Sequence, residues 1–425
     1  MNRRNFLQVA AASGVALLSP FGRRRAEAAP RRYEGPYWLL IHGSGGWDPT
    51  YVCDPKGEPI NKLFKRTDIG ALGNHRFAPV EYKNQQGEVL YRNEDFFRKF
   101  GSKLLVINGL DTTTGNHDTG TRVTWSGRVN EGHPTLAALL AGAHTPGNPL
   151  GFISSGGYDF TAGLAPLVRL GNVDAARRVA YPNRIDPTKA TYTYHSTATY
   201  ERIQARQRER LERLQGAQGL PALQRSLGAL YVARSGESEL DLLAQKLPSQ
   251  AAINGATNSL HRQSLVALAG FNAGLAVAAN LVLGGFDTHG NHDANHLPRL
   301  HDLLRGVDLI MDEITRQGLD NKVIVIVGSD FGRTPAYNVQ NGKDHWNITS
   351  MMMMGPGIPG NRVVGASDDG FKAKTFDPRT LAESAGGTRI RCEHVQRALR
   401  RLARIEGSEV AARYPLPGDD LPLFT

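Results

Sequence analysis

The sequence predicts an α/β fold, a three-layer sandwich in which helices cover both faces of a mainly parallel central sheet. Three short, mostly apolar runs have the length of buried strands, and each ends at a glycine or a polar turn: residues 37–41, 103–107 and 322–327. A helix is predicted between the last two strands, because apolar residues share one stripe at Leu297, Leu300, Leu304, Val307, Met311 and Ile314. Buried strands that alternate with helices imply a parallel sheet covered on both sides. Hydrophobic residues make up 40% of the 425 residues, enough for a large core, and we expect residues 29–425 to form a single domain.

The first 28 residues have the features of an export signal. Arg3-Arg4 is followed by Phe6-Leu7, by a short apolar stretch and then by the small-residue site Ala26-Glu27-Ala28. A positively charged start, an apolar centre and a small-residue cleavage site are typical of a cleaved signal peptide. The paired arginines resemble the twin-arginine type, so we expect the twin-arginine translocation machinery as a partner and a periplasmic or secreted protein. An ordinary secretion signal is the alternative.

The charge of the chain does not favour nucleic acid as a partner. The net charge of +10 includes five arginines and one glutamate from residues 1–28, and without them it is +6. That charge is moderate for a chain of this length. The 2 cysteines, Cys53 and Cys392, exclude a disulfide-built scaffold and a cysteine-rich zinc module. Export would allow them to pair, but two lone cysteines far apart in sequence can equally stay free.

Residues 265–286 contain no charged side chain and admit two interpretations. The stretch is long enough for a transmembrane helix, but it is rich in Ala and Gly and contains Asn272 and Asn280. We favour a buried helix that ends near Gly274, followed by a strand at 275–283 that delivers Asp287 to the sheet edge. On this interpretation the chain has no stable membrane span.

Residues 186–262 differ from their flanks and are predicted to form a helical insertion beside the sheet. The segment 200–214 carries charges of both signs, which is typical of a solvated helix. A basic helix that binds a partner is the weaker alternative. Met351 to Met354 indicate a buried strand, because consecutive strand residues point to opposite faces and not toward one metal.

Acidic residues and histidines follow the predicted strands. Asp48 comes after the first strand, and Asp287 and His289 follow the strand at 275–283. Asp330 comes after the strand at 322–327, and His345 follows later. Sites assemble where the carboxyl ends of parallel strands meet. Each residue alone is typical of a turn or a helix cap, but their repetition favours a metal site, and carboxylate with imidazole suits zinc, manganese or iron.

Three sequence blocks resemble a known family. They are similar to signature blocks of the domain-of-unknown-function 1501 family: Phe286-Asp287-Thr288-His289, Ser329-Asp330-Phe331-Gly332-Arg333-Thr334 and Gly342-Lys343-Asp344-His345. These are exported bacterial proteins, similar to the sulfatase branch of the alkaline-phosphatase superfamily. The resemblance therefore implies an alkaline-phosphatase/sulfatase-like fold with metal ligands at strand ends.

Carried over by position, the resemblance makes Asp48, Asp287, His289, Asp330 and His345 ligands of a divalent metal. Zinc, manganese or calcium is the implied cofactor. Phe331 stands where the superfamily commonly has a second ligand histidine, so the resemblance allows one ion or two. A small anionic ester, of phosphate or of sulfate, is the implied substrate.

The nucleophile of the related sulfatases has no counterpart here. The block 132–142 is similar to the sulfatase nucleophile block, but Gly132 stands at the nucleophile position and cannot attack. Thr135 or a metal-bound water could replace it, and the water is chemically simpler because a metal lowers its pKa. The alternative interpretation is that Pro134-Thr135 simply begins a helix and has no catalytic role.

Two further residues are candidates for the catalytic site. His117 follows the strand at 103–107 and could be an acid, a base or a ligand, or simply a loop histidine. Arg333 could hold an anionic substrate, or it could pair with a carboxylate.

The sequence leaves two classes of function open. The first is an exported hydrolase of phosphate or sulfate esters that uses metal-activated water. The second is an exported binding or assembly protein on the same fold, which the missing nucleophile supports. His42-Gly43-Ser44-Gly45-Gly46 suggests an α/β-hydrolase instead, but no serine lies in a G-x-S-x-G elbow.

Overall fold

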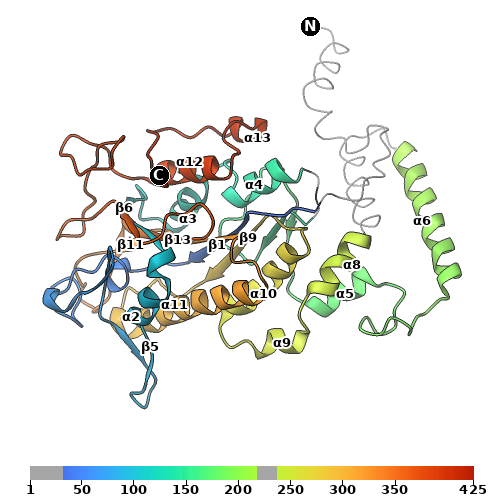
Figure 1. Ribbon diagram of the computed structural model, residues 1–425, viewed down its shortest axis with the longest axis horizontal. Helices are drawn as coiled ribbons and strands as arrows, with labels where there is room; N and C mark the ends of the chain where they lie inside the picture. Colours follow the sequence, from blue (N-terminus) through green and yellow to red (C-terminus); the bar gives the residue numbers. More distant parts are fainter. Residues whose placement is uncertain (1–31, 147, 149, 218–236) are drawn as a thin grey trace, which may run out of the picture. The chain divides into compact units, whose positions relative to one another are not determined.

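An eight-stranded sheet forms the centre of the fold (Figure 1). The structure, a computed structural model, describes residues 32–146, 148, 150–217 and 237–425, so the predicted export signal lies outside the described residues. The strand order is β14-β6-β13-β10-β1-β9-β7-β8. The strands are β1 (Tyr37–Gly43), β6 (Leu105–Asp111), β7 (Phe152–Ser154), β8 (Leu167–Val168), β9 (Ala278–Leu283), β10 (Val323–Ser329), β13 (Ile348–Met354) and β14 (Arg362–Val364).

The prediction of a mainly parallel sheet is confirmed. All strand pairs in it are parallel except those of β13, which runs antiparallel to both β10 and β6. Because only β13 is reversed, the carboxyl ends of β1, β6, β9 and β10 meet at one edge. That edge is where the predicted site residues were expected.

Helices cover both faces of the sheet, as predicted (Figure 1). On one face pack α2 (Asn93–Phe100), α10 (Ser259–Asn272) and α11 (His292–Arg316), and on the other α3 (His117–Ser126), α4 (Leu136–His144) and α12 (Cys392–Leu402). Alternate residues of β1 serve the two layers, since Leu39 packs in the first core and Leu40 in the second.

Residues 265–286 form a buried helix and a strand, as predicted. Helix α10 ends at Asn272, and β9 begins at Ala278 and pairs with β1. Among the described residues, no helix combines the length and the apolarity that crossing a membrane would need. The predicted methionine strand is also confirmed, because β13 contains all four methionines and is buried throughout.

The two cysteines are free. Cys53 lies in the core on the α10–α11 side of the sheet, and Cys392 lies in the core on the α4–α12 side. The sheet separates them, so they do not pair.

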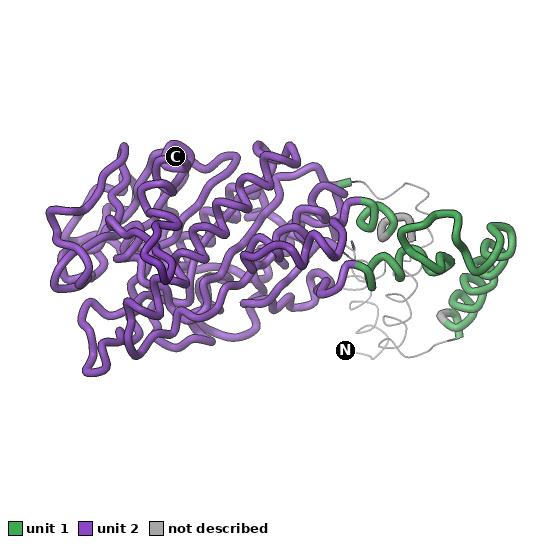
Figure 2. Tube along the Cα trace, turned by 90° about the horizontal axis from the view of Figure 1, so that it is seen from below, with its two compact units in different colours: residues 1–32, 174–245 green, residues 33–173, 246–425 purple. Residues whose placement is uncertain are grey.

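The chain divides into two compact units, which Figure 2 shows in different colours. Residues 33–173 and 246–425 carry the sheet and its helical layers. The described part of the other unit is residues 32, 174–217 and 237–245, with most of α5 (Val173–Ala180), α6 (Thr197–Ala217) and most of α8 (Glu237–Lys246). The predicted insertion, 186–262, overlaps this unit only in part, because α9 (Gln250–Gly255) and the start of α10 belong with the sheet.

Short segments complete the fold of the larger unit. Three two-stranded sheets join β2 (Gly70–Leu72) to β3 (His75–Phe77), β4 (Glu81–Lys83) to β5 (Val89–Arg92), and β11 (Gly332–Arg333) to β12 (His345–Trp346). The last pair matters for function, because it places Arg333 opposite His345. Helix α13 (Glu409–Ala412) lies near the end of the chain.

Candidate metal centre

Two glycines after β1 hold the carboxylate of Asp330 in place. The backbone N–H groups of Gly45 and Gly46 donate to Asp330 Oδ1 at 3.1 and 2.7 Å. Both glycines have positive φ, +114° and +80°. A Cβ atom at Gly45 would lie 2.5 Å from the Asp287 backbone nitrogen, and one at Gly46 would lie 2.6 Å from the Phe331 ring. Only glycine therefore fits at these two positions.

Three of the candidate residues converge at this edge of the sheet. His117 is the first residue of α3, Asp287 follows β9, and His345 lies on β12. One potential ligand atom from each lies within 4.8 Å of the others. A fourth residue touches two of them, because His289 Nε2 lies 3.0 Å from Asp287 Oδ1 and 2.9 Å from His345 Nε2. We call these four residues the His–Asp cluster.

The hydrogen bonds behind the cluster fix the orientation of each imidazole. The Nδ1 atom of His117 lies 2.5 Å from Asp330 Oδ2, that of His289 lies 2.8 Å from Asp344 Oδ1, and that of His345 lies 2.6 Å from the Gly115 carbonyl oxygen. Carboxylate and carbonyl oxygens only accept, so each Nδ1 atom carries the hydrogen. The Nε2 atom of each neutral ring then keeps its lone pair, which is the arrangement found at metal-binding histidines.

The cluster brings together acceptor atoms that a cation would satisfy. Asp287 Oδ1, His289 Nε2 and His345 Nε2 lie 2.9 to 3.2 Å apart, and His117 Nε2 lies 3.5 Å from Asp287 Oδ2. In a tetrahedral zinc site with bonds of about 2.0–2.1 Å, neighbouring ligand atoms are about 3.3 Å apart. A proton would join one pair of these atoms, whereas a divalent ion would be shared by the group His117, Asp287 and His345, to which His289 is adjacent. The residues present therefore fit a metal ion.

Charge favours the ionised form of the Asp287 ligand. Burial alone would raise its pKa, but the hydrogen bond from Arg333 and the positive charge of that guanidinium outweigh burial and lower the pKa of Asp287 to about 2. The carboxylate is therefore available to a cation at neutral pH. The hydrogen bond that His117 donates to Asp330 is the largest influence on the pKa of that imidazole and raises it.

The structure places Asp330, a predicted ligand, behind the cluster and not among its converging atoms. Both of its oxygens are already engaged, by the Gly45 and Gly46 amides, the Ser329 hydroxyl at 2.9 Å and His117. The side chain is almost fully buried behind His117. In this arrangement Asp330 orients the cluster residue His117 from behind.

The structure places Asp48, another predicted ligand, away from the cluster. Its carboxylate accepts from Lys343 Nζ at 2.6 Å, from His292 Nε2 at 3.1 Å, and from the backbone and hydroxyl of Thr50 at 3.0 and 2.5 Å. The Asp48, Lys343 and His292 side chains are all fully buried. The Lys343 ammonium thus supplies the positive charge that a metal was expected to supply.

A chain of hydrogen bonds links Asp48 to the loop that carries Asp287 and His289. The Asp48 N–H donates to His296 Nε2 at 2.9 Å, so His296 Nδ1 carries the hydrogen and donates to Thr288 Oγ1 at 2.9 Å. The Thr288 hydroxyl then donates to His292 Nδ1 at 2.7 Å, and His292 Nε2–H donates to Asp48. Every donor in this chain has an acceptor, and both imidazoles are neutral.

The sequence reasoning did not identify His292, His296 or Lys343. A signal was present for the two histidines, because their i, i+4 spacing puts them on one face of α11. Nothing in the spacing of Lys343 distinguishes a buried ion pair from a surface lysine.

Acidification should destabilise the fold through these two histidines. Burial lowers the pKa of His292 and lowers that of His296 well below the ordinary value of 6.5. Below about pH 6.5 the unfolded chain binds more protons than the folded chain, so stability that is present above that pH is lost as the pH falls. Urea unfolding between about pH 8 and pH 5 measures this loss. The slope should be shallower in His296→Gln, and an equal slope in both proteins would contradict this assignment.

Arg333 pairs with a carboxylate, which is the second of its two predicted roles. Its guanidinium donates to the Gly46 and Lys343 carbonyl oxygens at 2.8 and 3.0 Å and to Asp287 Oδ1 at 2.8 Å. The side chain is fully buried. Arg333 therefore supports the cluster from behind and is not placed to hold a substrate.

Thr135 and Gly132 do not belong to the cluster. Thr135 is the buried residue that precedes α4, and its hydroxyl has no hydrogen-bond partner among the described residues. This outcome agrees with the interpretation of Pro134-Thr135 as a helix start. Gly132 lies in the preceding turn at a φ of +86°, and a Cβ atom added there would meet nothing within 4 Å.

Phe331 packs against two of the cluster histidines. Its ring centroid lies 4.8 Å from that of His117 and 4.5 Å from that of His345, and the side chain is fully buried. The superfamily resemblance implies a second ligand histidine at this position, but this chain has the apolar ring of Phe331. The ring packs against both imidazoles and restricts their orientation.

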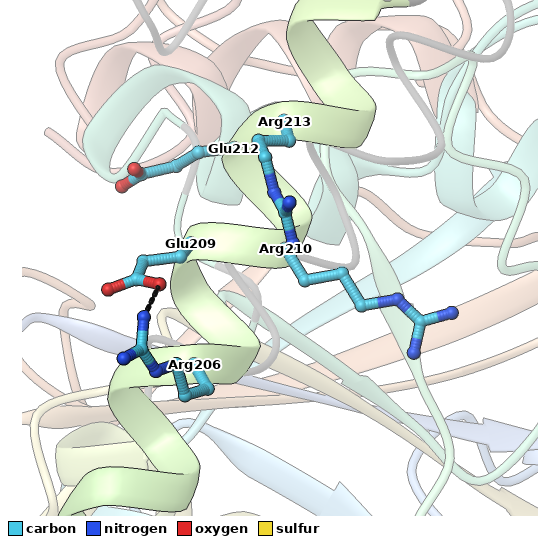
Figure 3. Close-up of a pocket in the computed structure, with 5 residues that line it drawn as sticks. All are labelled: Arg206, Glu209, Arg210, Glu212 and Arg213. Carbon is cyan, nitrogen blue, oxygen red and sulfur yellow. Dashed lines mark hydrogen bonds and ion pairs between the residues drawn. The ribbon is translucent and has the colours of Figure 1, made fainter.

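A surface hollow on α6 shows no such chemistry (Figure 3). Its lining is charged and comes from one helix: Arg206, Glu209, Arg210, Glu212 and Arg213. Arg206 Nη1 and Glu209 Oε2 form an exposed ion pair at 2.8 Å. These side chains match the prediction of a solvated helix with charges of both signs.

Comparison with known proteins identifies a family match. The model of the family described as "Protein of unknown function (DUF1501)" matches residues 38–384. No curated protein sequence is similar enough to count as a relative.

The fold is similar to several solved alkaline phosphatases and sulfatases. The alkaline phosphatase from the Antarctic bacterium TAB5 is 8% identical with a TM-score of 0.33, over 77% of this chain and 94% of that chain. Ps i-CgsB is 11% identical with a TM-score of 0.40, over 91% and 75%. The PsFucS1 sulfatase from Pseudoalteromonas sp. is 9% identical with a TM-score of 0.31, over 87% and 70%. TM-scores of this size carry no argument about activity, which has to come from the site.

Proposed function

The chain belongs to the DUF1501 family, and from this premise and the geometry of the His–Asp cluster we propose that it is an exported, metal-dependent hydrolase of phosphate or sulfate esters. One observation carries the proposal. The Nε2 atoms of three histidines converge on the Asp287 carboxylate while their Nδ1 atoms are held from behind. The export signal in residues 1–28, of the twin-arginine type, is the basis for placing the protein in the periplasm or outside the cell.

The donor set favours zinc or manganese over calcium. Calcium prefers six to eight oxygen ligands, whereas the cluster offers three imidazole nitrogens and one carboxylate. One ion is proposed, not two, because the Lys343 ammonium already neutralises Asp48. Such an ion would supply Lewis-acid chemistry, which lowers the pKa of a coordinated water and offsets the negative charge of an ester.

The residues of the chain contribute orientation and charge. Asp330, Asp344 and the Gly115 carbonyl hold the three imidazoles, and Arg333 keeps Asp287 ionised. Phe331 closes one side of the cluster to water.

A second candidate function is an exported binding or assembly protein that holds the ion without turnover. The specific observation in its favour is Gly132, which offers no nucleophile and lies outside the cluster. The two functions share the metal and differ only in catalysis.

The test combines metal analysis of the purified protein with a screen of phosphate, phosphonate and sulfate esters. If the protein is a hydrolase, we expect about one divalent ion per chain and turnover of at least one ester class. Both should be lost in His289→Ala. Bound metal without turnover of any ester would exclude the hydrolase and support the exported binding or assembly protein. Absence of metal after reconstitution with zinc and with manganese would contradict the site.

Replacing Asp330 by asparagine should weaken metal binding about 10- to 100-fold, because His117 loses the carboxylate that fixes its tautomer. Isothermal titration with zinc measures the change. Asp312→Asn, which alters an exposed carboxylate paired with Lys99, is the matched control and should bind zinc like the unmodified protein. Equal affinities for Asp330→Asn and Asp312→Asn would show that Asp330 does not orient His117.

A further inference from the structure

A polar cavity is lined in part by residues that adjoin the His–Asp cluster and its supports in the sequence. It has a volume of about 370 Å³, and six polar side chains line it: His42, Ser44, Asp118, Thr121, Arg122 and Tyr158. They come from β1 and the loop after it, from the first two turns of α3, and from the loop after β7. Val282 of β9 is the apolar side chain of the lining.

The cavity and the cluster share two backbone segments. Ser44 precedes Gly45, whose amide holds Asp330, and Asp118 follows the cluster residue His117. Burial lowers the pKa of His42, and the charges of Asp330 and His117 also act on it.

The cavity offers hydrogen-bond donors and acceptors together. His42 Nδ1 accepts from Trp125 Nε1 at 3.0 Å, so its Nε2 carries a hydrogen, whose only nearby acceptor among the described residues is Thr121 Oγ1 at a long 3.4 Å. The Arg122 side chain is 16% exposed and donates to the Val129 carbonyl at 2.6 Å, while its contact with Glu131 is long at 3.5 Å. Asp118 adds a carboxylate, and Ser44 and Thr121 add hydroxyl groups.

We propose that this cavity binds the alcohol part of the ester, and that this part is a small polyhydroxylated group such as a sugar or a polyol. Hydroxyl groups donate and accept, so they can satisfy Arg122, His42 and Asp118 at once. A carboxylate would be repelled by Asp118, and an aryl or alkyl group would leave buried polar atoms without partners. The volume is at the small end of the range for ligand sites, about 300–1,000 Å³, and suits one sugar-sized group.

The kinetic test of this inference rests on the proposed function, because it requires the protein to hydrolyse an ester. The unmodified protein and Asp118→Asn are compared on a hexose phosphate and on para-nitrophenyl phosphate, and on the corresponding sulfates. Loss of one charged hydrogen bond to the sugar should lower the ratio of kcat/KM for the hexose ester over the aryl ester about tenfold. Asp312→Asn is the matched control and should keep the ratio of the unmodified protein. An unchanged ratio in Asp118→Asn would overturn the proposal.

A binding measurement separates this inference from the proposed function. The free hexose and a polyol are titrated calorimetrically into the zinc-loaded protein, into Asp118→Asn and into Arg122→Gln, with Arg98→Gln as the control for the arginine. If no ester is hydrolysed, binding that both cavity variants lose would still support a polyol site while the hydrolase proposal fails. Turnover without preference for the hexose ester, or an absence of hexose and polyol binding in a protein without turnover, would overturn the cavity assignment.

Discussion

Replacing His345 by alanine is expected to weaken metal binding by more than about 100-fold and to remove any ester hydrolysis. The imidazole supplies one of the converging Nε2 atoms, 3.2 Å from Asp287 Oδ1 and 2.9 Å from His289 Nε2. Loss of a residue that merely orients a ligand costs about 10- to 100-fold in affinity, so loss of a ligand should cost more. Metal content after dialysis and zinc titration measure the effect.

The matched control for this variant is His301→Ala. His301 lies on α11 in the same unit and contacts Asp302, not the cluster. It should bind one ion like the unmodified protein. If His345→Ala retains its ion with the affinity of His301→Ala, the cluster is not the metal centre.

Lys343→Met is expected to destabilise the protein by about 3–5 kcal/mol, because it leaves the buried Asp48 carboxylate without its charged partner. The free energy of unfolding in urea measures the loss. Lys374→Met removes a partly exposed lysine that pairs with Glu383 and should cost no more than about 1 kcal/mol.

A double variant isolates the ion pair from the loss of packing. Asp48→Asn combined with Lys343→Met removes both charges, so it should recover part of the stability lost in Lys343→Met alone. If the double variant is less stable than the single variant by the full cost of Asp48→Asn, the two residues do not interact as described.

The strands and layers were predictable because their signals are local. Runs of apolar residues identified β1, β6, β10 and β13, and the apolar stripe identified α11. The reversed direction of β13 was not predictable, because Ile348–Met354 is equally apolar when read in either direction. Strand direction depends on the connection and on the neighbouring strands, which the run itself does not contain.

The site was predictable only in part, for a similar reason. Asp48, Asp287 and Asp330 each follow a strand, and their spacing predicts the same role for all three. What separates them is the partner opposite each carboxylate. Asp48 faces the Lys343 ammonium and Asp330 faces two glycine amides, whereas Asp287 faces the cluster imidazoles. Those partners come from distant parts of the chain.

A crystal structure of the zinc-loaded protein, with anomalous diffraction at the zinc edge, tests most directly whether one divalent ion binds at the His–Asp cluster. We expect one strong peak about 2.0–2.2 Å from the Nε2 atoms of His117, His289 and His345 and from a carboxylate oxygen of Asp287, with none at Asp48. A cluster without a peak, or a peak ligated by Asp48 in place of Lys343, would contradict this expectation.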